Sequence, residues 1–310
     1  MNTLVSVNNL SRYYGKFCAV DAISFTIQRG QIVGFLGANG AGKSTTMQML
    51  AGTLAPSHGA INIAGHNLLT HPVAAKSAIG YLPENPPLYQ DMRVNEFLNF
   101  CAQLHGLSGK TCKQAVDHAL DMCGLTAVAR RLIMHLSKGY QQRVGIAQAI
   151  LHAPEVLILD EPTVGLDPLQ IKEIRDLIQQ LGQAHSVIIS THILPEVQSL
   201  CTDVQIIHAG KLQVQLSMDE LQQHSPISSI KVGLKTPPDQ EKLMQLTGAV
   251  KIDTLPNNYL RIHYATQNTA ITEKLLHHAQ QQQWGLFALI PEQGNLEQLF
   301  INVTCADKTQ

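Results

Sequence analysis

Alternating apolar and polar positions over residues 4–36 predict short β-strands, with turns at Tyr14-Gly15 and Arg29-Gly30. The last of these strands is the apolar run Gln31–Leu36. A helical periodicity follows from Thr45 to Ala51. The chain is therefore expected to run from a buried strand through a short loop into a helix.

Two more strands and a group of helices are expected before residue 152. Glycines bound the strand pattern of Gly59–Gly65, and a second short strand spans Ile79–Leu82. A proline cluster at residues 83–87 then breaks the sheet pattern. Beyond it the periodicity is helical, and it predicts helices over residues 94–104, 111–122 and 137–151.

The next segment predicts the fold class. Residues Glu155–Asp160 contain four consecutive apolar residues before a carboxylate, which suits a strand buried on both faces of a mainly parallel sheet. A helix over 169–183 and a buried strand over 186–190 continue the alternation of strands and helices. We expect an α/β fold in which helices flank a mainly parallel sheet, with a helical subdomain inserted at about 86–152.

The pattern changes near residue 214, where we expect the first domain (residues 1–215) to end. Residues 216–226 are predicted to form a polar linker. Strand patterns at 227–234, 259–264 and 285–290, with a helical pattern at 269–282, predict a small C-terminal α+β domain over residues 227–310. No motif in this second domain carries recognisable chemistry.

Residues Gly37–Thr45 read Gly-Ala-Asn-Gly-Ala-Gly-Lys-Ser-Thr, the spacing of a phosphate-binding loop between a strand and a helix. Glycines allow backbone N–H groups to turn onto phosphate oxygens, and the helix N-terminus adds partial positive charge. Lys43 can place its charge on the terminal phosphates, and the Ser44 hydroxyl can ligate Mg2+. The loop residues expected to bind nucleotide are Gly37, Asn39, Gly40, Gly42, Lys43, Ser44 and Thr45.

Two adjacent carboxylates predict that the bound nucleotide is hydrolysed. Asp160 and Glu161 end the buried strand, at the sheet edge where ligands bind in doubly wound folds. Asp160 would hold Mg2+, directly or through water, and Glu161 could act as general base on the attacking water. The alternative is a pair of surface acids before a turn at Pro162, and the phosphate-binding loop argues against it.

Two other features are ambiguous on their own. Ser137 is a good N-cap for the helix that follows, and it is either a plain cap or part of a second anion-binding helix terminus. His192, in Ser190-Thr191-His192 after an apolar strand, is either a structural histidine at a strand end or a functional one.

Five motifs, taken in order, resemble those of the nucleotide-binding subunit of ABC transporters, including the signature motif of that family. The resemblance covers roughly residues 1–215, and the chain looks most like bacterial exporter-type subunits associated with gliding and multidrug export. The motifs are Gly37–Thr45, Leu136–Arg143, Leu157–Pro162, Gly165–Asp167 and Ser190–His192.

The resemblance implies roles for residues outside the phosphate-binding loop. Tyr14 falls where the family stacks an aromatic side chain on adenine, although adjacent Tyr13 could do this instead. Ser137 and Gly139 fall in the signature, which the family uses to contact the γ-phosphate held by a second subunit. Asp167 matches the loop that crosses the dimer interface.

The same resemblance makes His192 the switch histidine that contacts the γ-phosphate and helps position the water. Two features depart from the family pattern. Glu84 stands where a glutamine usually senses magnesium and the γ-phosphate; its carboxylate can ligate Mg2+ but cannot donate a hydrogen bond when ionised. Lys138 and Tyr140 replace usual signature residues, while the phosphate-contacting groups are kept, so we expect activity to survive.

Composition and charge limit the kinds of partner and the cellular location that we expect for this protein. The net charge of −1 gives no basic field, so no nucleic acid is expected. No run approaches the 18 or more apolar residues of a membrane span, and the first residues lack a secretion signal. The six cysteines form neither a metal-binding nor a disulfide pattern. We expect a cytoplasmic protein that reaches the inner face of the membrane through a partner.

The resemblance therefore implies an ATP-hydrolysing motor subunit of an ABC transporter, with ATP and Mg2+ as its cofactors. Two copies would form a homodimer, or a pseudo-symmetric pair, around two Mg-ATP and drive a separate multi-span membrane permease, for export. The alternative is a soluble ABC ATPase acting on the ribosome or on DNA; such relatives carry paired domains, long coiled coils or zinc cysteines, which this sequence lacks. An adenylate-kinase-like phosphotransferase would leave Leu136–Arg143 unexplained.

Overall fold

The computed structural model of the protein describes residues 3–224, 227–265, 271–292, 296, 299, 300 and 303. The chain divides into two compact units, Met1–Leu216 and Ser217–Gln310. The segment interpreted as a linker, residues 216–226, contains a short helix, α8 (Met218–His224), and its last two residues lie outside the described part. Positions 269 and 270 of the predicted C-terminal helix lie outside it as well.

A six-stranded sheet forms the centre of the first unit, in the order β10-β9-β3-β8-β7-β6. Parallel pairing joins β3 to β8 and β9, and β7 to β6 and β8, which confirms the mainly parallel sheet. The last two strands of this sheet along the chain, β9 and β10, have no counterpart among the predicted strands. The six strands are β3 (Ile32–Leu36), β6 (Ile79–Leu82), β7 (Val156–Asp160), β8 (Ser186–Thr191), β9 (Asp203–His208) and β10 (Lys211–Ser217).

The central strands are apolar throughout because both faces of the sheet are covered. All five residues of β7 are buried. Leu157 and Leu159 belong to one hydrophobic core, while Val156 and Ile158 belong to another. Alternate side chains of one strand thus enter two different cores, and the one polar residue of the strand, Asp160, stands at its C-terminal end.

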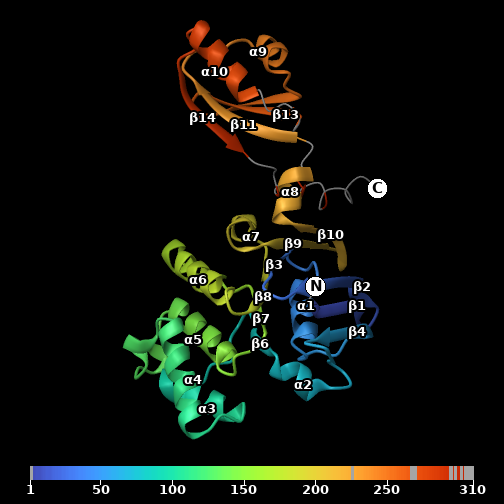
Figure 1. The fold of residues 1–310 in the computed structure, drawn as a ribbon, viewed down its shortest axis with the longest axis vertical. Coiled ribbons are helices and arrows are strands. Elements are labelled where there is room, and N and C mark those ends of the chain that lie inside the picture. Colours follow the sequence, from blue (N-terminus) through green and yellow to red (C-terminus); the bar gives the residue numbers. More distant parts are fainter. Residues whose placement is uncertain are drawn as a thin grey trace. The chain divides into compact units, whose positions relative to one another are not determined.

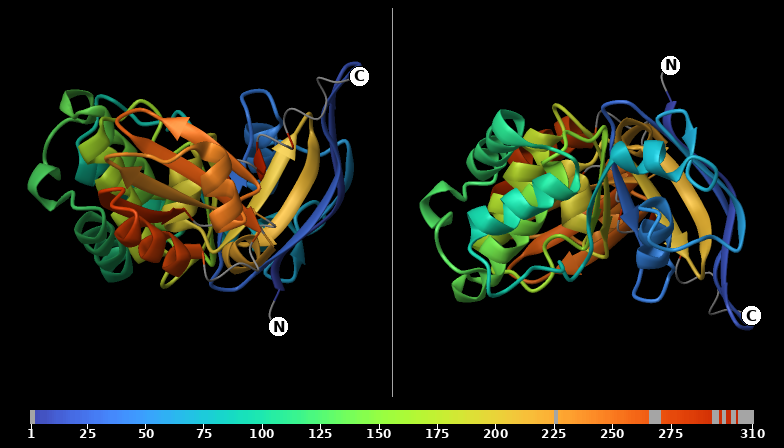
Figure 2. Two further views of the ribbon diagram at one scale, coloured as in Figure 1. Left: turned by 90° about the horizontal axis from the view of Figure 1, so that it is seen from above. Right: turned by 90° about the horizontal axis from the view of Figure 1, so that it is seen from below.

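Helices α3, α4, α5 and α6 cover the face of this sheet that carries Leu157 and Leu159, whereas α1 packs against the other face; the first three of these helices form the predicted subdomain. Its members α3, α4 and α5 lie at one end of the first unit, and β1, β2 and β4 lie at the opposite end (Figures 1 and 2). None of the helices that the structure describes is long and apolar enough to cross a bilayer. The helices of this unit are α1 (Lys43–Leu50), α2 (Pro72–Ser77), α3 (Val94–Leu104), α4 (Gly109–Met122), α5 (Lys138–Ile150), α6 (Pro168–Leu181) and α7 (Leu194–Leu200).

A second, antiparallel sheet in the order β2-β1-β4-β5 covers the other core. Its strands are β1 (Thr3–Tyr14), β2 (Phe17–Gln28), β4 (His58–Ile63) and β5 (His66–Asn67). The first two are longer than the short strands predicted. Bulges shift the register between them, with positive φ at Asn9 and Ala22, so the alternation breaks without ending the strand.

The second unit is an antiparallel four-stranded sheet in the order β12-β13-β11-β14, with helices α9 and α10 packed on one face. Ile230, Val232 and Ile262 of the sheet share a buried core with Leu243 and Leu275 of the two helices. Helix α9 and strand β12 have no counterpart among the predicted elements. The elements are β11 (Ile227–Leu234), α9 (Gln240–Thr247), β12 (Lys251–Leu255), β13 (Tyr259–Ala265), α10 (Ile271–Gln281) and β14 (Leu286–Glu292).

The cysteines that the structure describes are free thiols: Cys18, Cys101, Cys112, Cys123 and Cys201. Burial raises the pKa of the Cys123 thiol to about 12, so this side chain is a neutral part of the core. Cys305 lies outside the described residues.

The two-sided burial of β7 predicts a large cost for truncating its side chains. Ile158→Ala removes three carbon atoms from a fully buried position and should lower the free energy of unfolding of the first unit by about 2–5 kcal/mol. Urea unfolding followed by circular dichroism would measure this change. Val73→Ala on α2, where the side chain is 84% exposed, is the control and should stay within about 0.5 kcal/mol of the wild type. Equal effects of both variants would contradict the burial argument.

Candidate functional site

The phosphate-binding loop joins the buried strand β3 to helix α1, and its glycines are required by close backbone contacts. Gly42 has a φ of +105°, and a Cβ atom there would lie 2.6 Å from the carbonyl oxygen of Ala19. A Cβ atom on Gly37 would lie 2.6 Å from the carbonyl oxygen of Ile207. Any larger residue at these two positions would displace neighbouring backbone, so the loop conformation depends on glycine.

Lys43 begins α1, and its side chain is buried inside the loop. The Nζ atom donates hydrogen bonds to the carbonyl oxygens of Gly37, at 2.9 Å, and Ala38, at 3.2 Å. It also lies 3.3 Å from the Oε1 atom of Glu161. The ammonium group is thus held within the loop, next to the proposed base.

Asp160 is buried at the end of β7 and accepts two hydroxyl hydrogen bonds. Its Oδ1 atom lies 2.5 Å from Ser190 Oγ and 3.2 Å from Ser44 Oγ. Burial raises the pKa of Asp160 above its ordinary value; the two hydroxyl hydrogen bonds oppose this shift, and the charges of Glu161 and Glu84 add to it. No positively charged side chain is among the groups that shift the pKa of Asp160, so the protein leaves the charge of this carboxylate uncompensated.

Glu161 follows directly and has a φ of +48°, in the left-handed region that few residues other than glycine adopt. Its N–H group donates to both the carbonyl oxygen of Ser190, at 3.1 Å, and Ser190 Oγ, at 2.9 Å. Its Oε2 atom lies 2.9 Å from Nδ1 of His192, and its Oε1 atom faces Lys43. The parallel register that pairs Asp160 with Ser190 thus brings both carboxylates and the histidine together.

These groups open into a pocket of about 460 Å3. Tyr14 lines this pocket, whereas Tyr13 packs edge-on against His58, with ring centroids 6.1 Å apart. Gly37 and Asp160 do not line the pocket, although Asp160 accepts a hydrogen bond from Ser44, which does. The lining residues are Tyr14, Phe17, Ala19, Asn39, Gly40, Gly42, Lys43, Ser44, Thr45, Glu84, Glu161, Val164 and His192.

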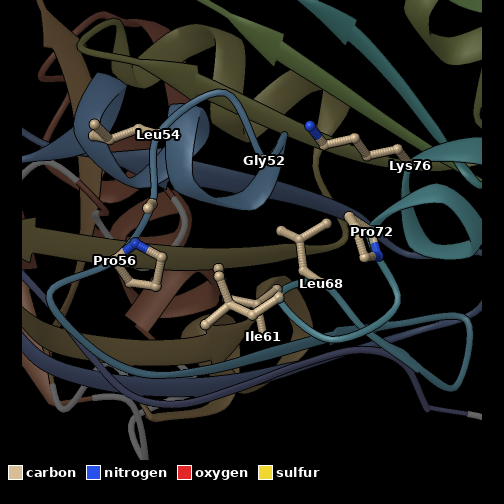
Figure 3. Close-up of a pocket in the computed structure, with 9 residues that line it drawn as sticks. Gly52, Leu54, Pro56, Ile61, Leu68, Pro72 and Lys76 are labelled. Atoms are coloured by element: carbon tan, nitrogen blue, oxygen red, sulfur yellow. The ribbon is translucent and has the colours of Figure 1, made fainter.

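A smaller pocket of about 220 Å3 lies just beyond the C-terminal end of α1 (Figure 3). Ile61, Leu68, Pro56 and Pro72 form its apolar wall, and the side chain of Lys76 runs along the other side towards Gly52. It contains no carboxylate, histidine or phosphate-binding loop, so the chemistry belongs to the larger pocket.

Comparison with known proteins identifies the family. Residues 20–164 match the profile of the family described as ABC transporter. The chain is 40% identical over 227 residues to the bacitracin transport ATP-binding protein BcrA of Bacillus licheniformis, covering 73% of each chain. This chain belongs to the ABC transporter ATP-binding proteins. It is accordingly an ATP-binding subunit of a transporter and an ATPase.

Two other ABC proteins extend the comparison. The linearmycin resistance ATP-binding protein LnrL of Bacillus subtilis is 30% identical over 305 residues, which cover 97% of this chain and 98% of LnrL. The structure of cbiO1 from Clostridium perfringens, described as part of the ABC transporter complex cbiONQ, is 30% identical with a TM-score of 0.66. It covers 72% of this chain and 92% of cbiO1. The P-loop α/β core of the ABC ATPases is thereby confirmed for the first unit.

The residues that the resemblance places in the signature, Ser137 and Gly139, and in the dimer-interface loop, Asp167, lie elsewhere in the first unit. Ser137 is the N-cap of α5, and its Oγ accepts a hydrogen bond from the N–H of Tyr140 at 3.4 Å. Gly139 packs closely against Gln170 of α6. Asp167 caps α6, accepting from two N–H groups of its first turn. None of these residues lines the pocket that holds Lys43 and Glu161.

Some residues at the pocket were not singled out by sequence reasoning. Ser190 donates a hydrogen bond to the Asp160 carboxylate and accepts one from the backbone N–H group of Glu161, and the signal that could have revealed it was its place in the same motif as His192. Phe17 lines the pocket and pairs with Tyr14 across the β1–β2 turn, which the tight turn at Gly15 could have indicated. Val164 and Ala19 line it too, and no local pattern marks them.

The oxygen atoms at this candidate site suit a hard divalent cation. Ser44 Oγ and Asp160 Oδ1 lie 3.2 Å apart, and Glu84 is near enough for its charge to act on Asp160. No cluster of three or more histidine, cysteine or acidic residues able to hold a metal occurs within the described ranges. Mg2+ usually needs only one or two protein ligands beside phosphates and water, so the residues present fit it.

The raised pKa of Asp160 predicts a pH-dependent cost in stability. Between the ordinary pKa of 3.8 and the raised folded-state pKa, the folded chain binds more protons than the unfolded chain, so stability falls as pH rises through this window. Asp160→Asn keeps an oxygen for both serine hydroxyls and cannot ionise. In the absence of nucleotide it should be more resistant to urea than the wild type at neutral pH.

The advantage of Asp160→Asn should shrink as the pH falls towards 3.8 and vanish below it. Urea unfolding of both proteins at a series of pH values would measure it. An advantage that grows on acidification would have the opposite sign and would contradict the assignment.

Proposed function

We propose that two copies of this ATPase close head to tail around two Mg-ATP and thereby drive a separate membrane permease in the direction of export. The observation that carries the proposal is the arrangement of Glu161, with Lys43 on one side of its carboxylate and His192 on the other, inside a pocket that the signature residues do not line. The pocket thus holds the groups proposed for hydrolysis but lacks the signature residues, which a second copy would have to supply.

The chemistry follows from the positions of these groups. Water attacks the γ-phosphorus of ATP, the bond from this phosphorus to the bridging β–γ oxygen breaks, and ADP leaves. Glu161 accepts the proton of the attacking water as general base. Lys43 stabilises charge on the phosphate oxygens, and His192, through its contact with Glu161 Oε2, helps to orient the water and the γ-phosphate.

We assign Mg2+ to Ser44 and Asp160, with Glu84 close by. When bound, Mg2+ neutralises phosphate charge and fixes the orientation of the leaving group. The uncompensated charge of buried Asp160 supports this assignment, because a divalent cation would supply the positive charge that no protein side chain provides there. Tyr14, on the pocket wall beside Phe17, is assigned to stack on adenine.

A second copy would supply what the pocket lacks. Ser137 caps the start of α5, where backbone N–H groups and the helix dipole favour an anion. A two-fold axis would bring Ser137 and Gly139 of each copy onto the ATP held by the other and make both sites identical. Asp167 would then lie between the copies. Phosphate charge would hold the pair together, and hydrolysis would release it.

The names of similar proteins support a permease partner and transport in the direction of export. The protein cbiO1 is described as part of a transporter complex, and BcrA and LnrL are named for bacitracin transport and linearmycin resistance. Resistance achieved by a transporter calls for removal of the compound from the cell, which supports export for this chain. A permease partner would place the chain at the inner face of the cytoplasmic membrane.

The general-base role predicts the behaviour of a conservative variant. Glu161→Gln keeps the shape of the side chain but removes the proton acceptor, so kcat for ATP should fall about a hundredfold or more while ATP binding persists. Phosphate release and binding of a fluorescent ATP analogue would measure the two quantities. Glu155→Gln, just before the opposite end of β7, is the control and should keep normal kcat. Normal turnover of Glu161→Gln would remove Glu161 from the role of base.

An exposed aromatic patch is our candidate for the permease contact. Tyr89 is 54% exposed and packs against two aromatic residues of α3, with ring centroids 6.0 Å from Phe97 and 5.7 Å from Phe100. Leu104, one turn beyond Phe100, is also exposed. This patch combines the loop that follows Glu84 with the helical subdomain, the two segments expected to transmit motion.

Replacing the patch should uncouple the ATPase from its partner. The double variant Tyr89→Ser, Phe100→Ser should reduce at least tenfold the amount of a multi-span membrane protein that co-purifies from detergent-solubilised membranes of the source cell, because interface aromatics carry much of the binding energy. Basal ATPase activity should persist. Val73→Ser, at an apolar position on α2 that is more exposed than either aromatic residue, is the control. Undiminished co-purification would exclude the patch as the contact.

A further inference from the structure

A buried carboxylate behind the ATP site contacts neither the pocket nor solvent. Glu196 lies in the first turn of α7 and is 2% exposed. Thr163 Oγ1 donates to its Oε1 atom at 2.6 Å, and Thr191 Oγ1 donates to its Oε2 atom at 2.8 Å. Arg175 Nη2 of α6 lies 3.8 Å from Oε1. Each carboxylate oxygen thus has a different hydroxyl partner.

The two hydroxyl groups belong to the two segments that carry the proposed chemistry. Thr163 is the second residue after Glu161, and Thr191 directly precedes His192. Both threonines are buried. The carboxylate of Glu196 therefore bridges the segment that carries Glu161 and the segment that carries His192. These are the two residues joined by the contact between Glu161 Oε2 and His192 Nδ1.

The bridge also reaches the start of the loop that ends at Asp167. Backbone hydrogen bonds join Val164 to Glu161, at 3.2 Å, and Leu166 to Thr163, at 3.3 Å, so this loop is a compact turn. A displacement of Asp167 would therefore move Thr163, and Thr163 is tied through Glu196 to the residue before the histidine.

The stability of the folded protein does not explain why a glutamate is buried at position 196. Burying a carboxylate costs free energy that its hydrogen bonds and ion pair must offset, and apolar residues of similar volume often serve a core as well. Hydrogen bonds to an ionised acceptor are, however, short and directional, and they fix geometry. An ionic bridge between two functional segments is therefore better suited to positioning than to packing.

We propose that Glu196 is a positioning residue for hydrolysis: through Thr163 and Thr191 it holds Glu161 and His192 in register and links His192 to the loop of Asp167. This inference rests on the roles proposed above for Glu161, His192 and Asp167. Loss of the bridge lets the two segments shift, and misplacement by about 1 Å at a reacting group can cost about a hundredfold in rate.

Isosteric variants test the bridge without opening a cavity. Thr163→Val and Thr191→Val each remove one hydroxyl, and each should lower kcat for ATP about tenfold or more in the purified full chain, with KM and the melting temperature close to wild type. Thr163→Ser and Thr191→Ser restore the donor and should restore kcat. The double valine variant should lose less than the product of the two single losses, because both act through one carboxylate.

Thr202→Val, at an exposed threonine of the first unit, is the control. Its hydroxyl is hydrogen-bonded to the backbone of Ile32 at the start of β3, the opposite end of that strand from the phosphate-binding loop, and kcat should not change. Normal kcat in both bridge valine variants would overturn the positioning role. A loss of kcat matched by a lower melting temperature, and not rescued by serine, would also overturn it, because it would reveal a purely structural role.

Glu161→Gln, measured in parallel, separates this inference from the proposed function. A slow Glu161→Gln with normal bridge valine variants refutes the role of Glu196 alone. A normal Glu161→Gln refutes the base assignment, and valine variants that remain slow and serine-rescued would then support positioning of His192.

Discussion

The proposed ATP site depends on the way two parallel strands end side by side. Because β7 and β8 are paired in register from Val156 with Ser186 to Asp160 with Ser190, the chain leaves both strands at the same edge of the sheet. Ser190 Oγ then lies between the carboxylate of Asp160 and the N–H group of Glu161. A slip of one residue would turn Ser190 to the other face and separate it from the carboxylate of Asp160 and the N–H group of Glu161.

This arrangement is costly, and the rest of the first unit sustains it. Asp160 is buried with a raised pKa, and Glu161 has a φ of +48°. Such features persist where the surrounding structure over-determines them, and they gather at functional sites. Here the apolar strands between two hydrophobic cores supply the rigidity, and the phosphate-binding loop places Lys43 against Glu161.

The parts of the fold that the sequence predicted well are those with a strong local pattern. Continuous apolar runs marked β3, β7 and β8, and the glycine spacing marked the loop before α1. By contrast, β10 alternates exposed and half-buried residues and has no buried face to mark it. Strands β1 and β2 were predicted as shorter strands because bulges interrupt the alternation of apolar and polar residues. The pairing of the two strands continues through these bulges.

The candidate site was predictable where one motif carries one role, as with Lys43 and Glu161. Contacts across the sheet were not, because they join residues about thirty positions apart. Ser190 with Asp160, and Thr163 with Glu196, depend on strand register and on the packing of α7, which no local pattern encodes. The choice between Tyr13 and Tyr14 likewise depended on which face of the hairpin each occupies.

The central claim is that a second copy completes each ATP site through Ser137. The most direct measurement is the mass in solution of the Glu161→Gln full chain, by size-exclusion chromatography with light scattering, with and without Mg-ATP, beside the same chain carrying Ser137→Arg. The account predicts a dimer in Mg-ATP for the first protein and a monomer for the second, although both bind ATP. An ATP-bound monomer of the first, or a dimer that survives Ser137→Arg, would contradict it.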